Sequence, residues 1–192
     1  MMKKRVSAIL LLLCGLLDLT ACDAKEAEPT PEAKVFEYSF EDFFGEKGEM
    51  SFPLFAAGMT QENVEEELGM SLEEFKSAQK TVVDASTGSY SGNSLLTVEG
   101  VPVTGGPAFD KESGLVSSVV LQFCDDGRSR EEWEKLTESW VRASGSLTPG
   151  GSGKISADGK TEVIINYTST GEAGASGETP LRLESIIMKY VY

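Results

Sequence analysis

The apolar positions of this chain follow three kinds of pattern, which together predict its fold class. Residues 36–55 hold a dense set of aromatic side chains, and we expect this aromatic segment to pack in a core. Residues 60–78 and 129–143 space their apolar side chains as helices do, whereas residues 95–124 and 154–192 alternate as strands do. This order predicts an α+β domain in two layers, with a mostly antiparallel sheet packed by a short helix pair and one longer helix.

The short helix pair is predicted from the residues at its helix ends. Thr60 is a candidate N-cap, and Gly69 can end the first helix in the left-handed conformation. Ser71 and Glu74 form the capping box of a second helix. The segment therefore reads as a helix, a tight corner and another helix.

The longer helix begins after Ser129, whose capping box closes on Glu132, and we expect it to end at Gly145. One face carries apolar residues at helical spacing: Trp133, Leu136, Trp140 and Ala143. We favour core packing for the two tryptophans, and a groove for a sugar or peptide is the alternative.

Five strands are predicted, and one tight hairpin connects two of them. Asp158-Gly159 is a two-residue hairpin signal, because both residues tolerate the positive φ angles of such turns. Pro102 interrupts the first strand, and a glycine-rich loop precedes the last. The expected strands are Leu95–Val103, Leu115–Cys124, Lys154–Ala157, Lys160–Ser169 and Leu181–Tyr192.

The first 21 residues have the order of an export signal. Lys3, Lys4 and Arg5 precede an apolar stretch that is shorter than the roughly 20 residues a membrane-spanning helix needs. The run Leu19-Thr20-Ala21-Cys22 that follows resembles the lipobox of bacterial lipoproteins. That resemblance implies cleavage between Ala21 and Cys22, and a diacylglycerol thioether on Cys22.

The resemblance also implies a location and a domain organisation. Residues 1–21 would be the signal peptide, and the mature chain would be anchored by its lipid on the extracytoplasmic face of the cell membrane. Residues 22–34 hold the acylated cysteine followed by Ala, Glu, Lys, Pro and Thr without apolar periodicity, which predicts a disordered tether. Residues 35–192 then form a single domain of ordinary size.

The charge of the chain limits its partners. The sequence has 17 Lys and Arg against 31 Asp and Glu, and removal of residues 1–21 leaves 14 against 30, a net charge of about −16. Nucleic acid binding requires a basic patch that this composition does not supply, so we expect no nucleic acid partner. Membrane attachment must likewise come from the lipid on Cys22 rather than from basic residues.

The residues that usually carry catalysis give mostly negative results. The chain has no histidine, which excludes Ser-His and Cys-His pairs and the HExxH zinc motif. Gly150–Lys154 lacks the leading glycine and the magnesium-binding hydroxyl of a phosphate loop, and Asp125–Gly127 reads as a turn rather than a calcium loop. Ser77–Lys80 with Ser91–Asn93 resembles penicillin-binding motifs, but their spacing and setting favour coincidence. We predict no catalytic residue, no metal and no cofactor.

A single cysteine remains in the folded part. Cys14 leaves with the signal and Cys22 is acylated, so no disulfide can form within the mature chain. We expect Cys124 to be a small buried hydrophobic residue, and a reactive thiol is the alternative.

Part of the helix pair is similar to a known motif. Gly58-Met59-Thr60, Val64 and Leu68-Gly69 resemble a segment of the β-lactamase-inhibitor-like fold and of small outer-membrane assembly lipoproteins of the SmpA/OmlA type. In those families a helix pair packs on an antiparallel sheet, and the members are inhibitors or scaffold proteins. The resemblance covers about a dozen residues and implies no particular contact residues.

The leading hypothesis is therefore a non-enzymatic envelope lipoprotein whose domain binds a protein partner. One alternative is a small-ligand or glycan-binding lipoprotein that uses the aromatic segment or the two tryptophans. Another is a hydrolase that works with carboxylates alone, which requires two acidic groups about 5–9.5 Å apart across a cleft.

Overall fold

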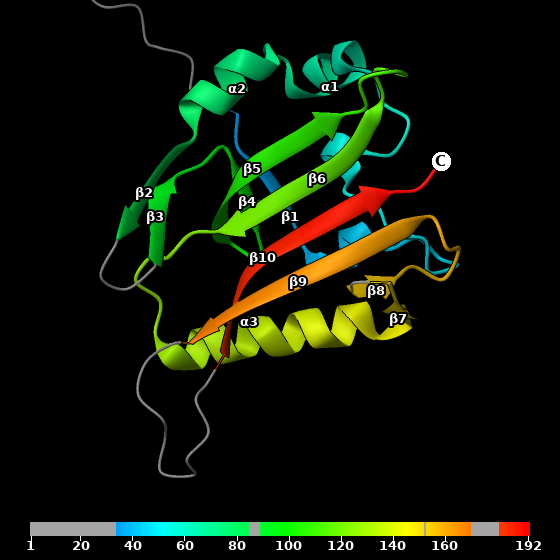
Figure 1. Cartoon of the computed structure of the whole chain (residues 1–192). Helices are drawn as coiled ribbons and strands as arrows, with labels where there is room; N and C mark the ends of the chain where they lie inside the picture. The colour runs from blue at the N-terminus through cyan, green and yellow to red at the C-terminus, as the bar shows by residue number, and fades with distance from the viewer. Residues whose placement is uncertain (1–33, 85–88, 152, 170–180) are drawn as a thin grey trace, which may run out of the picture. The chain divides into compact units, whose positions relative to one another are not determined.

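The computed structural model describes residues 34–84, 89–151, 153–169 and 181–192, and Ala33–Tyr192 form one compact unit. An eight-stranded sheet crosses this unit in the order β1-β4-β5-β6-β10-β9-β8-β7 (Figure 1). β1 and β4 pair in parallel and every other neighbouring pair is antiparallel, so the predicted α+β class with a mostly antiparallel sheet is confirmed. The strands are β1 (Phe36–Tyr38), β4 (Leu96–Val98), β5 (Val101–Phe109), β6 (Val116–Phe123), β7 (Thr148–Gly150), β8 (Gly153–Ile155), β9 (Thr161–Ser169) and β10 (Leu181–Tyr190).

Three α-helices form where capping residues predicted them: α1 (Gln61–Leu68), α2 (Leu72–Ala78) and α3 (Arg130–Ala143). The side chains of Thr60, Ser71 and Ser129 accept hydrogen bonds from backbone N–H groups three residues later, which satisfies donors that a helix start leaves free. Gly69 ends α1 with φ 69°, as expected. The predicted end at Gly145 is wrong by one residue, because α3 passes at Ser144 into the 3₁₀ turn η3 (Ser144–Ser146).

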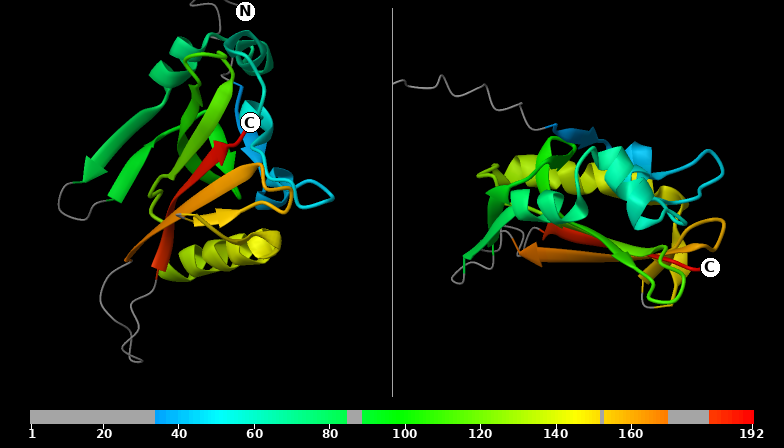
Figure 2. Two further views of the ribbon diagram at one scale, coloured as in Figure 1. Left: turned by 45° about the vertical axis from the view of Figure 1, so that its right-hand side comes forward. Right: turned by 90° about the horizontal axis from the view of Figure 1, so that it is seen from above.

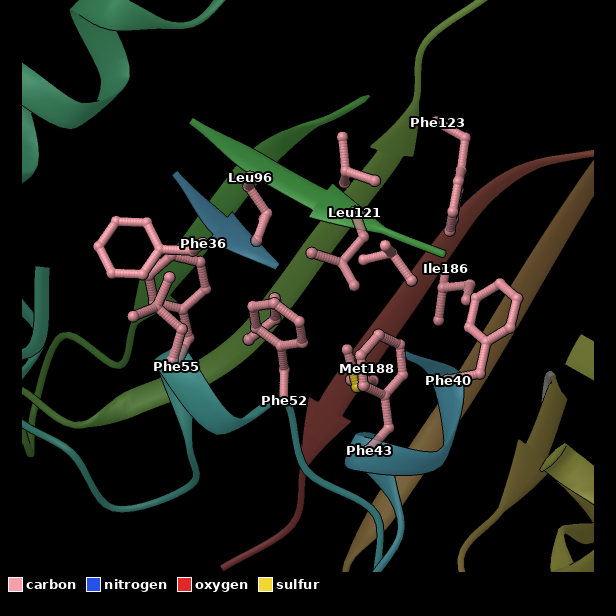
Figure 3. Close-up of a cluster of buried hydrophobic side chains, with 14 of the residues drawn as sticks. Phe36, Phe40, Phe43, Phe52, Phe55, Leu96, Leu121, Phe123, Ile186 and Met188 are labelled. Atoms are coloured by element: carbon pink, nitrogen blue, oxygen red, sulfur yellow. The ribbon is translucent and has the colours of Figure 1, made fainter. Parts of the chain in front are cut away.

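The core lies between the sheet and the aromatic segment, which folds into the 3₁₀ helices η1 (Phe40–Phe43) and η2 (Pro53–Phe55). Figure 3 shows these phenylalanine rings directed at sheet residues such as Leu121 and Ile186. α3 lies on the same side of the sheet as this segment (Figure 2, right). The buried aromatic residues are Phe36, Phe40, Phe43, Phe52, Phe55, Phe75, Phe123, Trp133, Trp140 and Tyr190.

Tyr190 fastens the aromatic segment to β10. Its hydroxyl donates to the Phe55 carbonyl at 3.0 Å and accepts from the Phe52 N–H at 3.1 Å and from the Ser51 hydroxyl at 3.4 Å. Burial raises the pKa of this hydroxyl, so it stays protonated and able to donate near neutral pH. One side chain of the last strand therefore satisfies buried polar groups about 135 residues earlier in the chain.

Two strand predictions need correction. The single strand expected at Leu95–Val103 is a hairpin of β4 and β5, turned by Glu99 and Gly100 with φ 52° and 70°. Positive φ at both central residues is the geometry of the tight hairpin turn that suits strand twist. Glu99 is held there because its carboxylate accepts the Phe40 N–H at 2.9 Å. Pro102 therefore lies inside β5 rather than interrupting a strand.

The expected two-residue turn at Asp158-Gly159 is a five-residue connection, residues 156–160, between β8 and β9. The Ser156 N–H donates to the Thr161 carbonyl, and the Gly159 N–H donates back to the Ser156 carbonyl. Asp158 favours the longer loop because its carboxylate accepts from the Ser156 hydroxyl and the Lys160 N–H. Four further strands were not predicted: β1, β7 and the separate two-stranded sheet of β2 (Lys80–Asp84) and β3 (Ser89–Asn93).

Candidate functional site

The predicted anchor lies outside the described residues. Ala21, Cys22 and the tether up to residue 33 are therefore not placed, and lipid attachment at Cys22 stays a prediction. Lys34, the last residue of the predicted tether, already contacts the domain: its Nζ lies 3.4 Å from the Glu67 carbonyl oxygen and 4.6 Å from the centre of the Phe36 ring. Within the described residues, no helix is long and apolar enough to cross a membrane.

The aromatic residues considered for a glycan platform are used in the core. Trp133 and Trp140 are 3% and 0% exposed, and the Trp140 ring packs edge-on against Phe40. Above Trp133 lies the guanidinium of Arg182, 4.9 Å from the ring centre, which also pairs with Asp125 at 2.8 Å. The predicted core role of the tryptophans is confirmed, and the Asp125 turn serves to hold the start of β10.

Cys124 is a free, fully buried thiol, as predicted. Its Sγ lies 4.0 Å from the Thr104 hydroxyl, and burial raises the pKa of the thiol. A reactive cysteine needs an accessible thiolate, so this side chain acts as a packing residue in the structure.

Several carboxylates serve as acceptors in helix caps and turns. Glu74 and Glu132 each accept from the serine hydroxyl and N–H of their capping box, and these bonds hold the pKa of both carboxyls below the ordinary value. Asp110 and Asp158 accept comparable bonds in turns, with the same effect on their pKa. A glycosidase-type general acid requires the opposite shift, so these four groups do not suit that role.

An open hollow of about 240 Å³ lies between the β4–β5 turn and α3. Its lining is mostly charged: Glu99, Arg128, Glu132, Lys135, Leu136 and Ser139. The charged groups bond within the protein, since Arg128 pairs with Asp126 at 2.9 Å and Lys135 with Glu131 at 3.1 Å. Two of the cationic side chains of the hollow are therefore already paired with carboxylates of the protein, which does not favour a ligand site there.

The other motifs considered in the sequence lie in strands, turns and a helix end of the fold. Gly150, Gly153 and Lys154 of the rejected phosphate-loop motif lie in the paired strands β7 and β8. Asp125–Gly127 is a turn in which the Asp125 carboxylate accepts the Gly127 N–H. Ser77 is exposed near the end of α2. The side chains of Lys80 and Ser91–Asn93 lie outside the part of the chain whose side chains the structure describes. Among the described residues, no group of three or more metal-binding side chains comes together.

The open edge of β9 is the feature that sequence analysis did not identify. β8 pairs with β9 only through Lys154–Val163 and Ile155–Glu162, although β9 continues to Ser169 along β10. In the described part of the chain, no strand lies beside Ile164–Thr168 on the side away from β10. Figure 1 shows this half of β9 extending beyond β8, with α3 running below it.

Two hydrogen bonds at the start of β9 establish which backbone groups face the open side. The Thr161 carbonyl accepts from Ser156 on the β8 side, whereas the Lys160 carbonyl accepts from Val191 on the β10 side. Because backbone groups alternate along a strand, odd-numbered residues of β9 point away from β10. The N–H and C=O groups of Ile165 and Tyr167 therefore face the open edge.

Tyr167 connects this edge to α3, and exposed apolar side chains occur on α3 and at the start of β10. Tyr167 is 37% exposed and adjoins Trp140, whose indole partly offsets the rise that burial causes in the pKa of the Tyr167 hydroxyl. On α3, the Thr137 hydroxyl lies 3.5 Å from the Leu181 carbonyl oxygen, and Val141 follows one turn later with 59% exposure. Leu181 itself is 52% exposed. The edge of β9 and this flank of α3 together form the candidate site.

A sequence signal for this site exists but is weak. Ile164–Ser169 has strand-like composition without a charge, proline or glycine, which marks an unprotected strand wherever it lies at an edge. Only the topology shows that it does. Comparisons with protein-family models, with curated proteins and with solved structures find no match to this chain.

Proposed function

We propose that this chain is a membrane-anchored envelope lipoprotein, held by a lipid on Cys22 at the extracytoplasmic face, whose α+β domain binds another protein without catalysing a reaction. The observation that carries the proposal is the edge of β9, where no described strand pairs with Ile165 and Tyr167 and the Tyr167 side chain is partly exposed. An open strand edge is a surface that other polypeptides recognise.

The side chains described above support a binding role over a catalytic one. Aromatic rings fill the core, the Cys124 thiol is buried, and the charged groups of the hollow near Glu99 bond within the protein. The chain has no histidine, and the carboxylates of the helix caps are held ionised by their hydrogen bonds. These side chains stabilise the fold.

The composition of the chain supports a protein partner over nucleic acid or a glycan. A net charge of −14 repels phosphate backbones. Glycans stack on exposed aromatic faces, whereas Trp133 and Trp140 are buried. Exposed backbone edges and apolar side chains suit a polypeptide.

The anchoring half of the proposal is tested by cell fractionation. A Cys22→Ser variant should move to the soluble fraction, whereas a Cys14→Ser variant, altered upstream of the expected cleavage site, should stay with the membrane. Retention of Cys22→Ser in the membrane would refute lipid anchoring.

The binding half is tested by chemical crosslinking of the native lipoprotein in its own cells, followed by purification and quantitative mass spectrometry. The proposal predicts one partner recovered reproducibly and near stoichiometrically. Recovery of background proteins alone, at the level of an uncrosslinked sample, would refute it.

A further inference from the structure

We propose that the open edge of β9 receives an extended, basic segment of the partner protein, which adds to the sheet as a further strand beside α3. This inference rests on the proposed function, because it names the chemistry and the seat of the partner.

Among the described residues, no strand pairs with the outward N–H and C=O groups of Ile165 and Tyr167, which leaves two donors and two acceptors in strand geometry. An added strand can pair with all four, which is how strand addition gains affinity. Several groups on the side of β5 away from β6 are occupied or absent instead: the Gly105 N–H donates to Gln79 Oε1 at 2.7 Å, the Val103 carbonyl accepts from the Ser94 hydroxyl, and Pro107 has no N–H. The fold therefore protects the free side of β5 and leaves that of β9 open.

The side chains beside this edge suit an extended segment. Natural edge strands are protected by charges, prolines or bulges, and Ile164–Ser169 contains no charged residue and no proline. Alternate side chains of an added strand would face Tyr167 and Val141, which supply apolar contact area of the kind that marks interaction sites. α3 follows this side of the sheet in both Figure 1 and the left view of Figure 2, so an added strand would lie alongside the helix.

Charge decides the kind of strand. The whole chain carries a net charge of −14, or about −16 once residues 1–21 are removed, so long-range charge repels a second copy. A partner segment rich in Lys or Arg is attracted by the negative charge of this chain, whereas a second copy of the chain is repelled by it. The occupant is therefore a basic segment of a different protein.

The central test compares two substitutions of one residue. Tyr167→Pro removes the outward N–H and leaves the inward pairs with β10 intact, whereas Tyr167→Ala removes the same ring and keeps the N–H. In the cellular crosslinking experiment, Tyr167→Pro should lower partner yield about tenfold relative to Tyr167→Ala, because a backbone hydrogen bond is lost and the ring around the missing N–H blocks close approach. Equal yields from the two variants would overturn the inference.

A second measurement does not depend on how the proline variant folds. A photoreactive benzoylphenylalanine at Val141 should crosslink the same partner through a Lys- or Arg-rich segment. At Arg142, which is exposed but lies farther round the helix, the same group should give little product. Equal labelling from both positions, or a labelled segment that is acidic, would overturn the inference.

These outcomes separate the two proposals. A partner captured equally by wild type, Tyr167→Pro and Tyr167→Ala leaves the protein-binding function in place and refutes the β9 seat. The absence of a partner from wild-type cells refutes the function and the inference that rests on it.

Discussion

Tyr190→Phe is the substitution whose effect the structure specifies best. It removes one oxygen and leaves the ring in place, so the packing of β10 against the aromatic segment is kept. The hydroxyl now satisfies the buried Phe52 N–H and Phe55 carbonyl, and neither group gains a partner from phenylalanine. The change therefore isolates the hydrogen bonds.

The expected loss follows from the number of groups left unpaired. A buried donor or acceptor without a partner costs about 1–3 kcal/mol, so two such groups predict a loss of about 2–6 kcal/mol in the free energy of unfolding. With a urea slope of about 2 kcal/mol/M, the unfolding midpoint should fall by about 1–3 M. The matched control is Tyr192→Phe, since the Tyr192 hydroxyl also meets two backbone groups but its side chain is 68% exposed.

The assay is equilibrium urea unfolding of the Cys22→Ser chain, followed by tryptophan fluorescence because Trp140 is fully buried. Water can replace the Tyr192 hydroxyl, so its removal should cost about 1 kcal/mol or less. A Tyr190→Phe loss no larger than that of Tyr192→Phe would refute the role assigned to Tyr190.

Three further predictions follow from single residues. Gly105→Ala should strongly destabilise the sheet, because a Cβ at this residue, whose φ is +124°, would lie 2.0 Å from the Val120 carbonyl oxygen. In the control Gly114→Ala, the new Cβ meets no atom within 4 Å, so only the strain of the positive φ should lower stability. The urea unfolding midpoints of the two variants check the difference. Hydrogen bonds from Ser129 lower the pKa of the Glu132 carboxyl in the folded protein. The stability that the ionised carboxylate contributes is therefore complete above the ordinary pKa of 4.5 and is lost as the pH falls through the folded-state pKa. The difference in urea unfolding midpoint between wild type and Glu132→Gln should shrink from pH 7 to pH 3. Burial protects the Cys124 thiol, so iodoacetamide should alkylate it only as fast as the surrounding fold opens. Alkylation in native buffer as fast as that of an exposed thiol would contradict the buried position of Cys124.

The helices were predictable because their signals are local. Thr60, Ser71 and Ser129 each bond within three residues of their own position, so the sequence around them is sufficient to place a helix start. The predicted hairpins were less accurate, since long-range contacts decide them. Glu99 adopts positive φ with support from Phe40, a residue 59 positions earlier, and no local pattern indicates that.

The candidate site was hidden from sequence analysis for a related reason. Ile164–Ser169 was correctly predicted as a strand, but whether a strand is central or at an edge depends on which segments pair with it. Among the described residues, β8 begins at Gly153, whose backbone lies so close to β9 that a Cβ would meet the Val163 carbonyl oxygen at 2.2 Å. The buried roles of Trp140 and Cys124, by contrast, follow from composition and spacing and were predicted correctly.

Residue-resolved hydrogen exchange tests the central claim most directly, because it reads the backbone groups on which the claim depends. In the free protein, the amides of Ile165 and Tyr167 should exchange rapidly, while that of Ile164, which faces β10, should be protected. In the complex with the captured partner, all three should be protected. Protection of Ile165 and Tyr167 in the free protein, or their rapid exchange in the complex, would contradict an open edge that pairs with a partner strand.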